Sequence, residues 1–180
     1  PLVGRSVEHK QLVECYHRSR RGQTQIVIVQ GEAGIGKTRL VQETLRWAAA
    51  QGATILQGKA FETSGRLPYQ PVVDALRSYL ARSEAPQALL GEVWLAELSR
   101  LLPELRDQYP TLPRPTSEER AAKTRMFEAV ARLGQALAGR QPVVIFVDDL
   151  QWADAASLDL LHYVVRRLSE ETLPIQLIFS

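Results

Sequence analysis

Apolar residues along the chain gather into four short runs, separated by longer segments of mixed polarity. The runs cover residues 25–30, 53–59, 143–147 and 175–179, and β-branched residues are frequent in them. The uninterrupted β-branched stretch 26–29 is typical of a strand that is covered on both faces. The pattern therefore predicts four strands and places 26–29 in the interior.

The segments between these runs carry helical signals. Good helix formers or amphipathic spacing predict helices over 5–21, 37–50, 72–81 and 87–102. Three prolines keep 109–115 from becoming helical. Strands that alternate with helices favour a parallel sheet with helices on both faces. We therefore expect one α/β domain over the whole chain, with a helical insertion between its second and third strands.

Two further helices are expected to pack against the sheet through apolar stripes. The first begins with a capping pattern, Thr116 followed by Glu119, and ends at Gly139. Its predicted buried stripe is Met126, Val130, Leu133 and Leu137. The second helix precedes the last strand, and its predicted buried face is Leu158, Leu161, Val165 and Leu168.

The segment 31–38 carries the most specific chemistry. It reads Gly-Glu-Ala-Gly-Ile-Gly-Lys-Thr and matches the phosphate-binding pattern G-x-x-x-x-G-K-[ST] in full. Glycines let the backbone curl so that successive amides converge on phosphate oxygens, and the helix that follows adds the positive end of its dipole. The predicted nucleotide-binding residues here are Gly31, Gly34, Ile35, Gly36, Lys37, Thr38 and Arg39.

Two side chains of this loop have chemical roles in the prediction. Lys37 would supply a positive charge to the β and γ phosphates of ATP, and the Thr38 hydroxyl is placed to bind Mg²⁺. The alternative is an accidental glycine-rich turn. The motif, however, follows a predicted strand and opens a predicted helix, which is the context that the pattern requires.

Adjacent carboxylates follow the third predicted strand. Asp148 and Asp149 come directly after the apolar run 143–147, as in a Walker B strand. Because ligands of parallel sheets bind at the carboxyl ends of strands, Asp148 is expected beside the phosphate loop as a Mg²⁺ ligand. Asp149 would face the attacking water and is the candidate general base. The alternative is that these aspartates only end the strand and cap a turn.

Composition narrows the function classes further. The net charge is +2 and the basic residues are not clustered, so direct nucleic-acid binding by this segment is not expected. The only cysteine, Cys15, excludes an intramolecular disulfide. No apolar run approaches the length of a bilayer span. A cytoplasmic setting without membrane contact fits these observations best.

Three stretches resemble the ATPase domain of the STAND group of AAA+-related NTPases, found in large LuxR-type transcriptional regulators and related bacterial signalling proteins. They are 2–5 near the start, 31–40, and 148–154 with its Trp152 and Asp154. The resemblance spans nearly the whole chain, and the third stretch is its most family-specific part.

The resemblance implies roles for residues outside the phosphate loop. It implies that Val3, Gly4 and Arg5 line the adenine pocket, with a plain surface turn as the alternative for Arg5. For Trp152 we expect packing under the loop after the third strand. For Asp154 we expect an N-cap of the helix that follows.

The resemblance also implies parts that would follow the chain: a fifth strand, a sensor residue after the fourth strand, and a small lid. The chain is therefore expected to be a C-terminally truncated domain. In the implied strand order 5-1-4-3-2, loss of strand five would leave 26–29 as an exposed edge. No arginine finger can be assigned, although Arg39, Arg66 and Arg140 are available cations.

The preferred hypothesis is a regulatory switch that binds ATP with Mg²⁺ and hydrolyses it slowly, with full activity depending on self-association or on other regulatory domains. A small-molecule kinase is an alternative, since it uses the same loop and would need an acceptor site. A nonhydrolysing nucleotide-binding scaffold is another. DNA binding and transcriptional control would belong to other parts of the parent protein.

Overall fold

A four-stranded parallel sheet forms the centre of the protein. The computed structural model describes residues 4–62, 68–81 and 86–180. The strands are β1 (Gln25–Ile28), β2 (Thr54–Lys59), β3 (Val143–Asp148) and β4 (Ile175–Phe179). They pair in the order β1-β4-β3-β2, and every pair is parallel. The α/β fold of a P-loop NTPase is thus confirmed, and the order agrees with the one implied for strands one to four.

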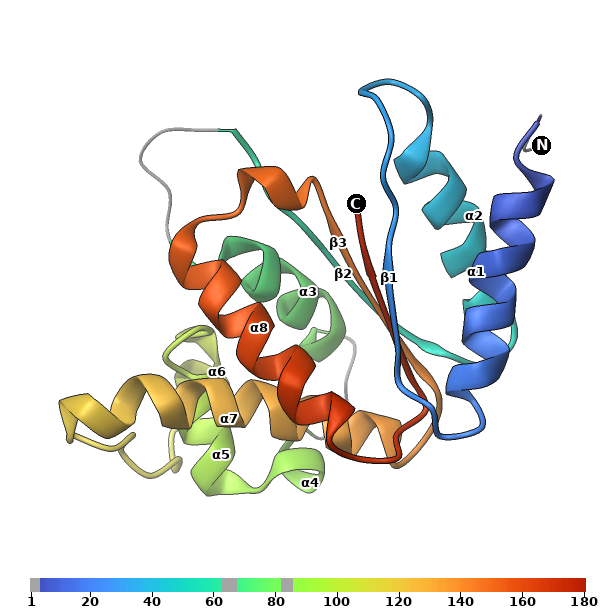
Figure 1. The fold of residues 1–180 in the computed structure, drawn as a ribbon. Coiled ribbons are helices and arrows are strands. Elements are labelled where there is room, and N and C mark those ends of the chain that lie inside the picture. The colour runs from blue at the N-terminus through green and yellow to red at the C-terminus, as the bar shows by residue number, and fades with distance from the viewer. Residues whose placement is uncertain (1–3, 63–67, 82–85) are drawn as a thin grey trace.

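Helices cover both faces of this sheet (Figure 1). One face carries α1 (Ser6–Ser19) and α2 (Lys37–Ala50), and the other carries α3 (Gln70–Leu80) and α8 (Ala155–Ser169). Successive residues of a strand point to opposite faces, so β3 divides its side chains between two cores. Val144 and Phe146 pack with α1 and α2, whereas Val143 and Val147 pack with the larger core on the other side.

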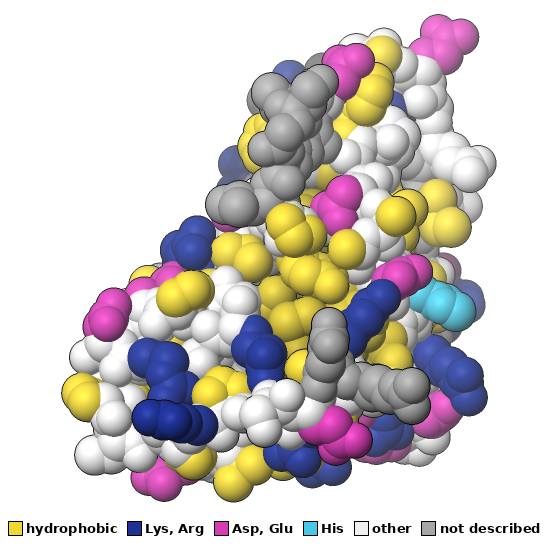
Figure 2. Space-filling view, turned by 90° about the vertical axis from the view of Figure 1, so that its left-hand side faces the viewer, with side chains coloured by type: hydrophobic (Ala, Val, Ile, Leu, Met, Phe, Trp, Pro, Cys, Tyr) yellow, Lys and Arg dark blue, Asp and Glu magenta, His cyan; other side chains and the backbone are white. Residues whose placement is uncertain are grey.

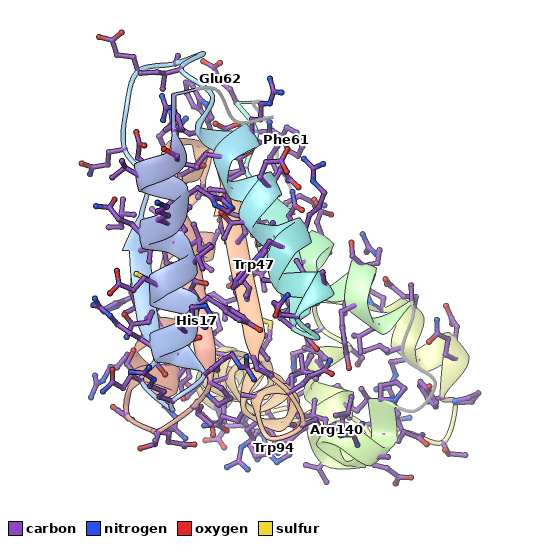
Figure 3. All side chains as sticks on the ribbon, turned by 90° about the vertical axis from the view of Figure 1, so that its right-hand side faces the viewer. His17, Trp47, Phe61, Glu62, Trp94 and Arg140 are labelled. Atoms are coloured by element: carbon purple, nitrogen blue, oxygen red, sulfur yellow. The ribbon has the colours of Figure 1, made fainter. Side chains whose placement is uncertain are left out.

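Aromatic rings pack together near the C-terminal ends of α1 and α2, beside the smaller core. His17 and Trp47 lie side by side there, with ring centroids 5.5 Å apart (Figure 3). Tyr16 also packs edge-on against Trp47 at 5.2 Å. His17 is itself exposed, so its ring packs on Tyr16 and Trp47 from the surface. The described residues contain no cluster of His, Cys, Asp and Glu that could hold a metal.

The insertion between β2 and β3 is helical, as predicted, but it is divided differently. Besides α3 it contains α4 (Pro86–Leu90), α5 (Glu92–Leu98), α6 (Glu104–Gln108) and α7 (Glu119–Ala138). The single helix expected over 87–102 is wrong because Gly91, at φ 75°, breaks it into α4 and α5. The short helix α6 was not predicted.

The predicted cap of α7 is also wrong. Thr116 does not cap the helix; the N-cap is Glu118, without a side-chain cap hydrogen bond. The reason is tertiary, because the backbone amide of Thr116 donates to Glu97 Oε1 at 2.9 Å and its carbonyl accepts from Arg100. The buried stripe of α7 is confirmed: its members are Met126, Val130, Leu133 and Leu137.

Helix α8 is rotated relative to its prediction. Leu161 and Leu168 are buried as expected, but Leu158 is 43% exposed and Val165 is only partly buried. The residues of α8 that are buried are Ser157, Leu160, Leu161, Val164 and Leu168. Trp152 is likewise 40% exposed, so its predicted packing under the loop is wrong. The predicted N-cap is confirmed, since Asp154 accepts from the Ser157 amide at 2.9 Å.

Strand β1 lies at an edge of the sheet formed by the described residues. Ile26 is 49% exposed and Ile28 is 64% exposed, so burial of 26–29 on both faces is wrong. Alternate residues of this strand face solvent because none of the described helices covers that side of the edge strand. The exposed edge that the implied strand order suggested is present.

The opposite side of the molecule carries α8 and the insertion. Its surface shows apolar side chains in the middle, with Lys and Arg side chains around them (Figure 2). Within the part of the chain that the structure describes, no helix has the length and apolar character needed to cross a bilayer.

Candidate nucleotide-binding site

The phosphate loop connects the end of β1 to the start of α2. Gly34 and Gly36 have φ angles of 78° and 92°, a backbone region that favours glycine. Gly36 is the N-cap of α2 and offers no side-chain acceptor to the first turn. Most of the amides there therefore remain available to an anion, which the helix dipole would also attract.

Lys37 lies across this loop. Its Nζ donates to the carbonyl oxygens of Gly31, at 3.0 Å, and Glu32, at 3.1 Å. These carbonyls are neutral acceptors and leave the ammonium charge uncompensated. A phosphate would meet that charge at the mouth of the loop, where it is exposed to solvent.

Thr38 and Asp148 meet beneath the loop. The Thr38 hydroxyl lies 2.9 Å from Asp148 Oδ2 and 3.2 Å from Oδ1. Thr38 is in the first turn of α2 and Asp148 is the last residue of β3, and both lie at the carboxyl edge of the parallel sheet. The sheet topology thus brings together two residues that are 110 positions apart, as the sequence predicted.

Asp148 is a buried carboxylate that forms no direct ion pair within the part of the chain that the structure describes. Asp148 is only 2% exposed. Besides Thr38, its contacts are the hydroxyl of Ser180 and the backbone amide of Asp149, which donates to Oδ1 at 3.1 Å. A buried carboxylate whose hydrogen bonds come from neutral donors is suited to binding an added cation.

The oxygen donors at this position fit Mg²⁺. Mg²⁺ prefers oxygen ligands and is commonly bound through one or two protein groups, with phosphates and water supplying the rest. The Thr38 hydroxyl and the Asp148 carboxylate are such groups. Ser180 was not predicted as part of the site, because the sensor residue that the resemblance implies after the fourth strand was expected beyond the end of the chain.

Asp149 turns away from the strand that precedes it. Its backbone is in the left-handed region, at φ 55°, and its Oδ2 forms an ion pair with Lys59 Nζ at 3.0 Å. Gln151 Nε2 donates to the other oxygen at 3.4 Å. The hydrogen bond to Asp149, and then the charge of that carboxylate, raise the pKa of Lys59. Lys59 therefore carries its positive charge at neutral pH.

Lys59 was missed by the sequence reasoning. Its only signal is its place at the end of β2, the strand that pairs with β3. Lys59 and Asp148 are register partners, so the Lys59 side chain reaches the residue that follows Asp148. A lysine in a strand of mixed polarity gives no indication of this partner without the strand order.

The N-terminal segment contacts the phosphate loop. Arg5 Nη2 donates to the backbone carbonyl of Ile35 at 2.7 Å. Gly4, at φ 79°, forms the turn before this arginine. Val3 lies outside the described residues. The contact places Arg5 beside the loop, which agrees with a position near a bound nucleotide, although its role toward adenine stays a prediction.

A cleft of about 850 Å³ opens above these residues. It is lined by the phosphate loop, the start of α2, Asp149, the first two residues of η1 (Leu150–Trp152), and the ends of β1 and β4. The exposed Leu158 of α8 also lines it. Its volume is within the range of small-molecule and cofactor sites.

The three arginines named as available cations differ in where they lie relative to the cleft. Arg39 lines the cleft. Arg140 lies in the connection that leads into β3, so it is at the opposite end of the sheet; in Figure 3 it is drawn at the far end from Phe61 and Glu62. Arg66 lies outside the described residues. Arg140 is therefore not brought to the site.

Comparisons with known proteins agree with this geometry. Residues 1–178 match the family described as AAA ATPase domain. An uncharacterized protein of Rhizobium meliloti (strain 1021) is 27% identical over 180 residues, which covers 94% of this chain and 18% of that protein. The hybrid signal transduction histidine kinase G of Dictyostelium discoideum is 27% identical over 176 residues, covering 89% of this chain and 5% of that protein. The chain thus spans less than a fifth of either relative.

Proposed function

The chain belongs to the AAA ATPase domain family, and from this premise we propose that it binds ATP with Mg²⁺ and hydrolyses it as a regulatory switch. The observation that carries the proposal is the contact of Thr38 with Asp148 under a complete phosphate loop. The two residues are Mg²⁺-binding groups by chemistry, and they meet where the loop would hold the β and γ phosphates.

Binding of the phosphates is assigned to the loop itself. Amides at the start of α2 would accept the phosphate oxygens, and Lys37 would release its two carbonyl partners to contact the β and γ phosphates. Ile35, Gly36 and Arg39 belong to the same segment and would contribute to binding, and Arg5, which donates to the Ile35 carbonyl, would lie with Gly4 near the bound nucleotide. Bound Mg²⁺ would neutralise charge on the phosphates during transfer.

Hydrolysis is assigned to Asp149. It lines the same cleft as the loop, so its carboxylate can orient a water molecule and accept its proton. The positive charge of Lys37 would stabilise the charge that develops on the transferred phosphoryl group.

A switch role in a signalling protein is the finer part of the proposal. The Dictyostelium relative is named as a signal transduction histidine kinase, and the chain resembles the ATPase module of LuxR-type transcriptional regulators. In this role, ATP would favour one arrangement of a multidomain protein and hydrolysis would reset it, with other domains or a second copy as partners.

The decisive experiment measures Mg²⁺-dependent binding of fluorescent ATP by the protein and by Lys37→Ala, with GTP as a competitor. We expect Lys37→Ala to weaken binding at least about 100-fold, because a charge-assisted contact to phosphate is lost. Lys123→Ala is the matched control, since it removes an exposed lysine of α7 that is paired with Asp159. Equal binding by wild type and Lys37→Ala, both folded, would refute the proposal.

Product analysis then separates the alternatives. Release of inorganic phosphate from ATP in water supports the ATPase. A phosphorylated small-molecule acceptor would indicate a kinase, and tight binding of ATP without turnover would indicate a scaffold. Asp149→Asn is expected to lower kcat by about 100-fold or more while ATP binding persists.

A further inference from the structure

Asp154 accepts hydrogen bonds from the starts of two helices. Its carboxylate accepts from the backbone amide of Ser157, at 2.9 Å, and from the Ser157 hydroxyl, and these contacts cap α8. The backbone amide of Tyr69, the N-cap residue of α3, donates to the same carboxylate. A helix leaves such amides at its start without a partner inside the helix. One side chain therefore joins the start of α8 to the start of α3, which lies on the same face of the sheet (Figure 1).

The Asp154 carboxylate is ionised in the folded protein. Burial opposes its ionisation, but the hydrogen bonds from Ser157 and Tyr69 outweigh burial and lower the pKa of Asp154. Hydrogen bonds to an ionised acceptor are stronger than those between neutral groups. The contact with Tyr69 is therefore well suited to hold two segments of the chain together.

Tyr69 and Asp149 share an uncommon backbone conformation. Their φ angles are 69° and 55°, and within the described ranges they are the only residues other than glycine with a positive φ. Such a conformation persists where the surrounding structure holds it, and it occurs often at functional sites. Asp154 binds the first of these two residues and ends the loop that begins with the second.

The loop 149–154 is anchored at both ends. At its start, the amide of Leu150 donates to the carbonyl of Ser180 at 2.8 Å, and inside it the amide of Trp152 donates to the carbonyl of Asp149 at 2.9 Å. At its other end, the Asp154 side chain binds α3 and α8. Because the loop is short, the place of this second anchor limits where the Asp149 carboxylate can lie in the cleft.

The anchor on α3 is itself held firmly. The Tyr69 ring packs edge-on against Phe127 of α7, with ring centroids 6.0 Å apart, and Phe127 packs in the same way against Tyr163 of α8 at 5.7 Å. Phe127 is only 5% exposed. The Tyr69 amide is therefore a fixed point to which Asp154 can tie the loop.

We propose that Asp154 is a positioning residue for ATP hydrolysis, because it holds the loop 149–154 against the start of α3 and thereby sets the place of the Asp149 carboxylate in the cleft. This inference rests on the proposed ATPase function and adds a residue to it. A residue that only caps α8 would need no more than the two contacts with Ser157. The third contact, to another helix, is the one that would position the loop.

The first test compares Asp154→Ser with the control Ser157→Ala in ATP-hydrolysis and ATP-binding assays. Serine is also a good N-cap residue, so Asp154→Ser should keep the cap of α8, but its short side chain should not reach Tyr69 as well. We expect kcat to fall about tenfold, since a small displacement of a group that orients water is costly, while the Kd for ATP changes less than about twofold. Ser157→Ala removes the hydroxyl contact and keeps the amide, so it should retain the wild-type kcat.

The second test reads the link to α3 without nucleotide. In amide hydrogen exchange followed by NMR, Asp154→Ser should expose the amides of Tyr69, Leu150 and Trp152 to exchange at least about tenfold faster than in the wild type, and Ser157→Ala should not. A wild-type kcat in Asp154→Ser, unchanged exchange at Leu150 and Trp152, or a parallel loss of ATP binding and thermal stability would each overturn the inference. Failure of the proposed function is distinct, because the wild type itself would then not bind or hydrolyse ATP, whatever the exchange shows.

Discussion

Two buried carboxylates, one beneath the phosphate loop and one in the helical insertion, have very different surroundings. Asp148 is 2% exposed and Glu97 is 1% exposed. Hydroxyl groups and a backbone amide surround Asp148, whereas Glu97 pairs with Arg100 at 3.0 Å and Arg125 at 2.9 Å. A buried charge paired by arginines fixes structure, while one without a cation is a site for an added cation.

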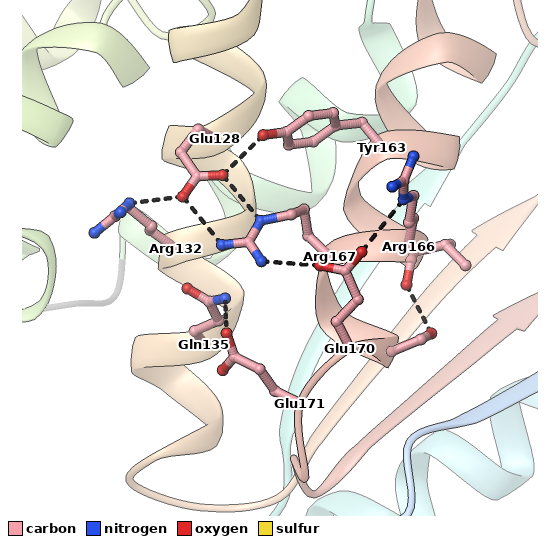
Figure 4. A network of polar contacts seen from close by, with 10 residues as sticks. Glu128, Arg132, Gln135, Tyr163, Arg166, Arg167, Glu170 and Glu171 are labelled. Atoms are coloured by element: carbon pink, nitrogen blue, oxygen red, sulfur yellow. Dashed lines mark hydrogen bonds and ion pairs between the residues drawn. The ribbon is translucent and has the colours of Figure 1, made fainter.

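A second carboxylate of the insertion, that of Glu128, is also paired with arginines. Glu128 of α7 accepts from Arg132, from Arg167 of α8 and from the Tyr163 hydroxyl, as Figure 4 shows. Arg167 also pairs with Glu170 at 3.2 Å. Helices α7 and α8 are thus joined by charge pairs at a place distant from the nucleotide cleft, where no ligand has to enter.

The largest expected effect separates the two carboxylates directly. Glu97→Gln should lower the free energy of unfolding by about 3 kcal/mol, because Arg100 and Arg125 lose their charged partner. Asp148→Asn should change it by less than about 1 kcal/mol, and the change can be stabilising, since a buried charge is removed. Denaturant unfolding without nucleotide measures both. Glu92→Gln, on the exposed side of α5, is the matched control for Glu97→Gln.

The same two variants should differ in how much Mg²⁺ and ATP stabilise them against unfolding. Saturating ligand at about 100 times its Kd should stabilise the wild type by about 2.7 kcal/mol. Asp148→Asn should lose most of this ligand-dependent stabilisation, while Glu97→Gln should keep it on its lower baseline. Equal ligand responses in a thermal unfolding assay would contradict the distinction between the two carboxylates.

A smaller effect is expected where the insertion joins the sheet. A Cβ added at Gly58 of β2 would lie 1.8 Å from the backbone carbonyl oxygen of Pro71 in α3. Gly58→Ala should therefore displace α3 and cost about 2 kcal/mol, measured by urea unfolding. Gly139→Ala is a suitable control, because its nearest neighbours would be 3.6 Å away. A Gly58→Ala protein as stable as this control would show that α3 shifts freely.

Low pH should destabilise the helical insertion, because it protonates the carboxylates of Glu97 and Glu128. Burial opposes ionisation of Glu97 and Glu128, but the hydrogen bonds and charges of their partners outweigh it and lower the pKa of each below 4.5. Their stabilising contribution is therefore complete above about pH 4.5 and is lost as the pH falls through the lower folded-state pKa. We expect the free energy of unfolding to fall as the pH is lowered through this window, in unfolding curves measured from pH 6 to pH 3. Glu97→Gln should flatten this dependence, and an unchanged slope would contradict it.

The smallest effect tests the orientation of α8 beside the cleft. Leu158→Ala should cost no more than about 0.5 kcal/mol, since this side chain is 43% exposed. Leu160→Ala, at a fully buried position of the same helix, should cost about 2 to 4 kcal/mol. Thermal unfolding of both variants checks the pair, and a larger loss at Leu158 would indicate that the helix faces the sheet as the sequence predicted.

The predicted buried face of α8 was partly wrong because the spacing of its apolar residues fits more than one face. Leucines and valines occur on more than one side of this helix, so several stripes satisfy helical periodicity. The structure buries Leu160 and Val164, and Leu158 faces the cleft instead. Thr116 failed as a cap for a related reason, because a buried glutamate far along the chain binds its amide.

The sequence by itself determined the class of fold and the chemistry of the phosphate loop. Strand runs, the bounds of α2 and the residues 31–38 are local patterns, and local backbone preferences fix them. The sequence also predicted that Asp148 lies beside this loop, but only the tertiary structure decided that Lys59 meets Asp149 and that Glu97 meets Arg125. Such pairs depend on strand order and on burial, which set the distance and the dielectric between charges and leave no trace in a single sequence.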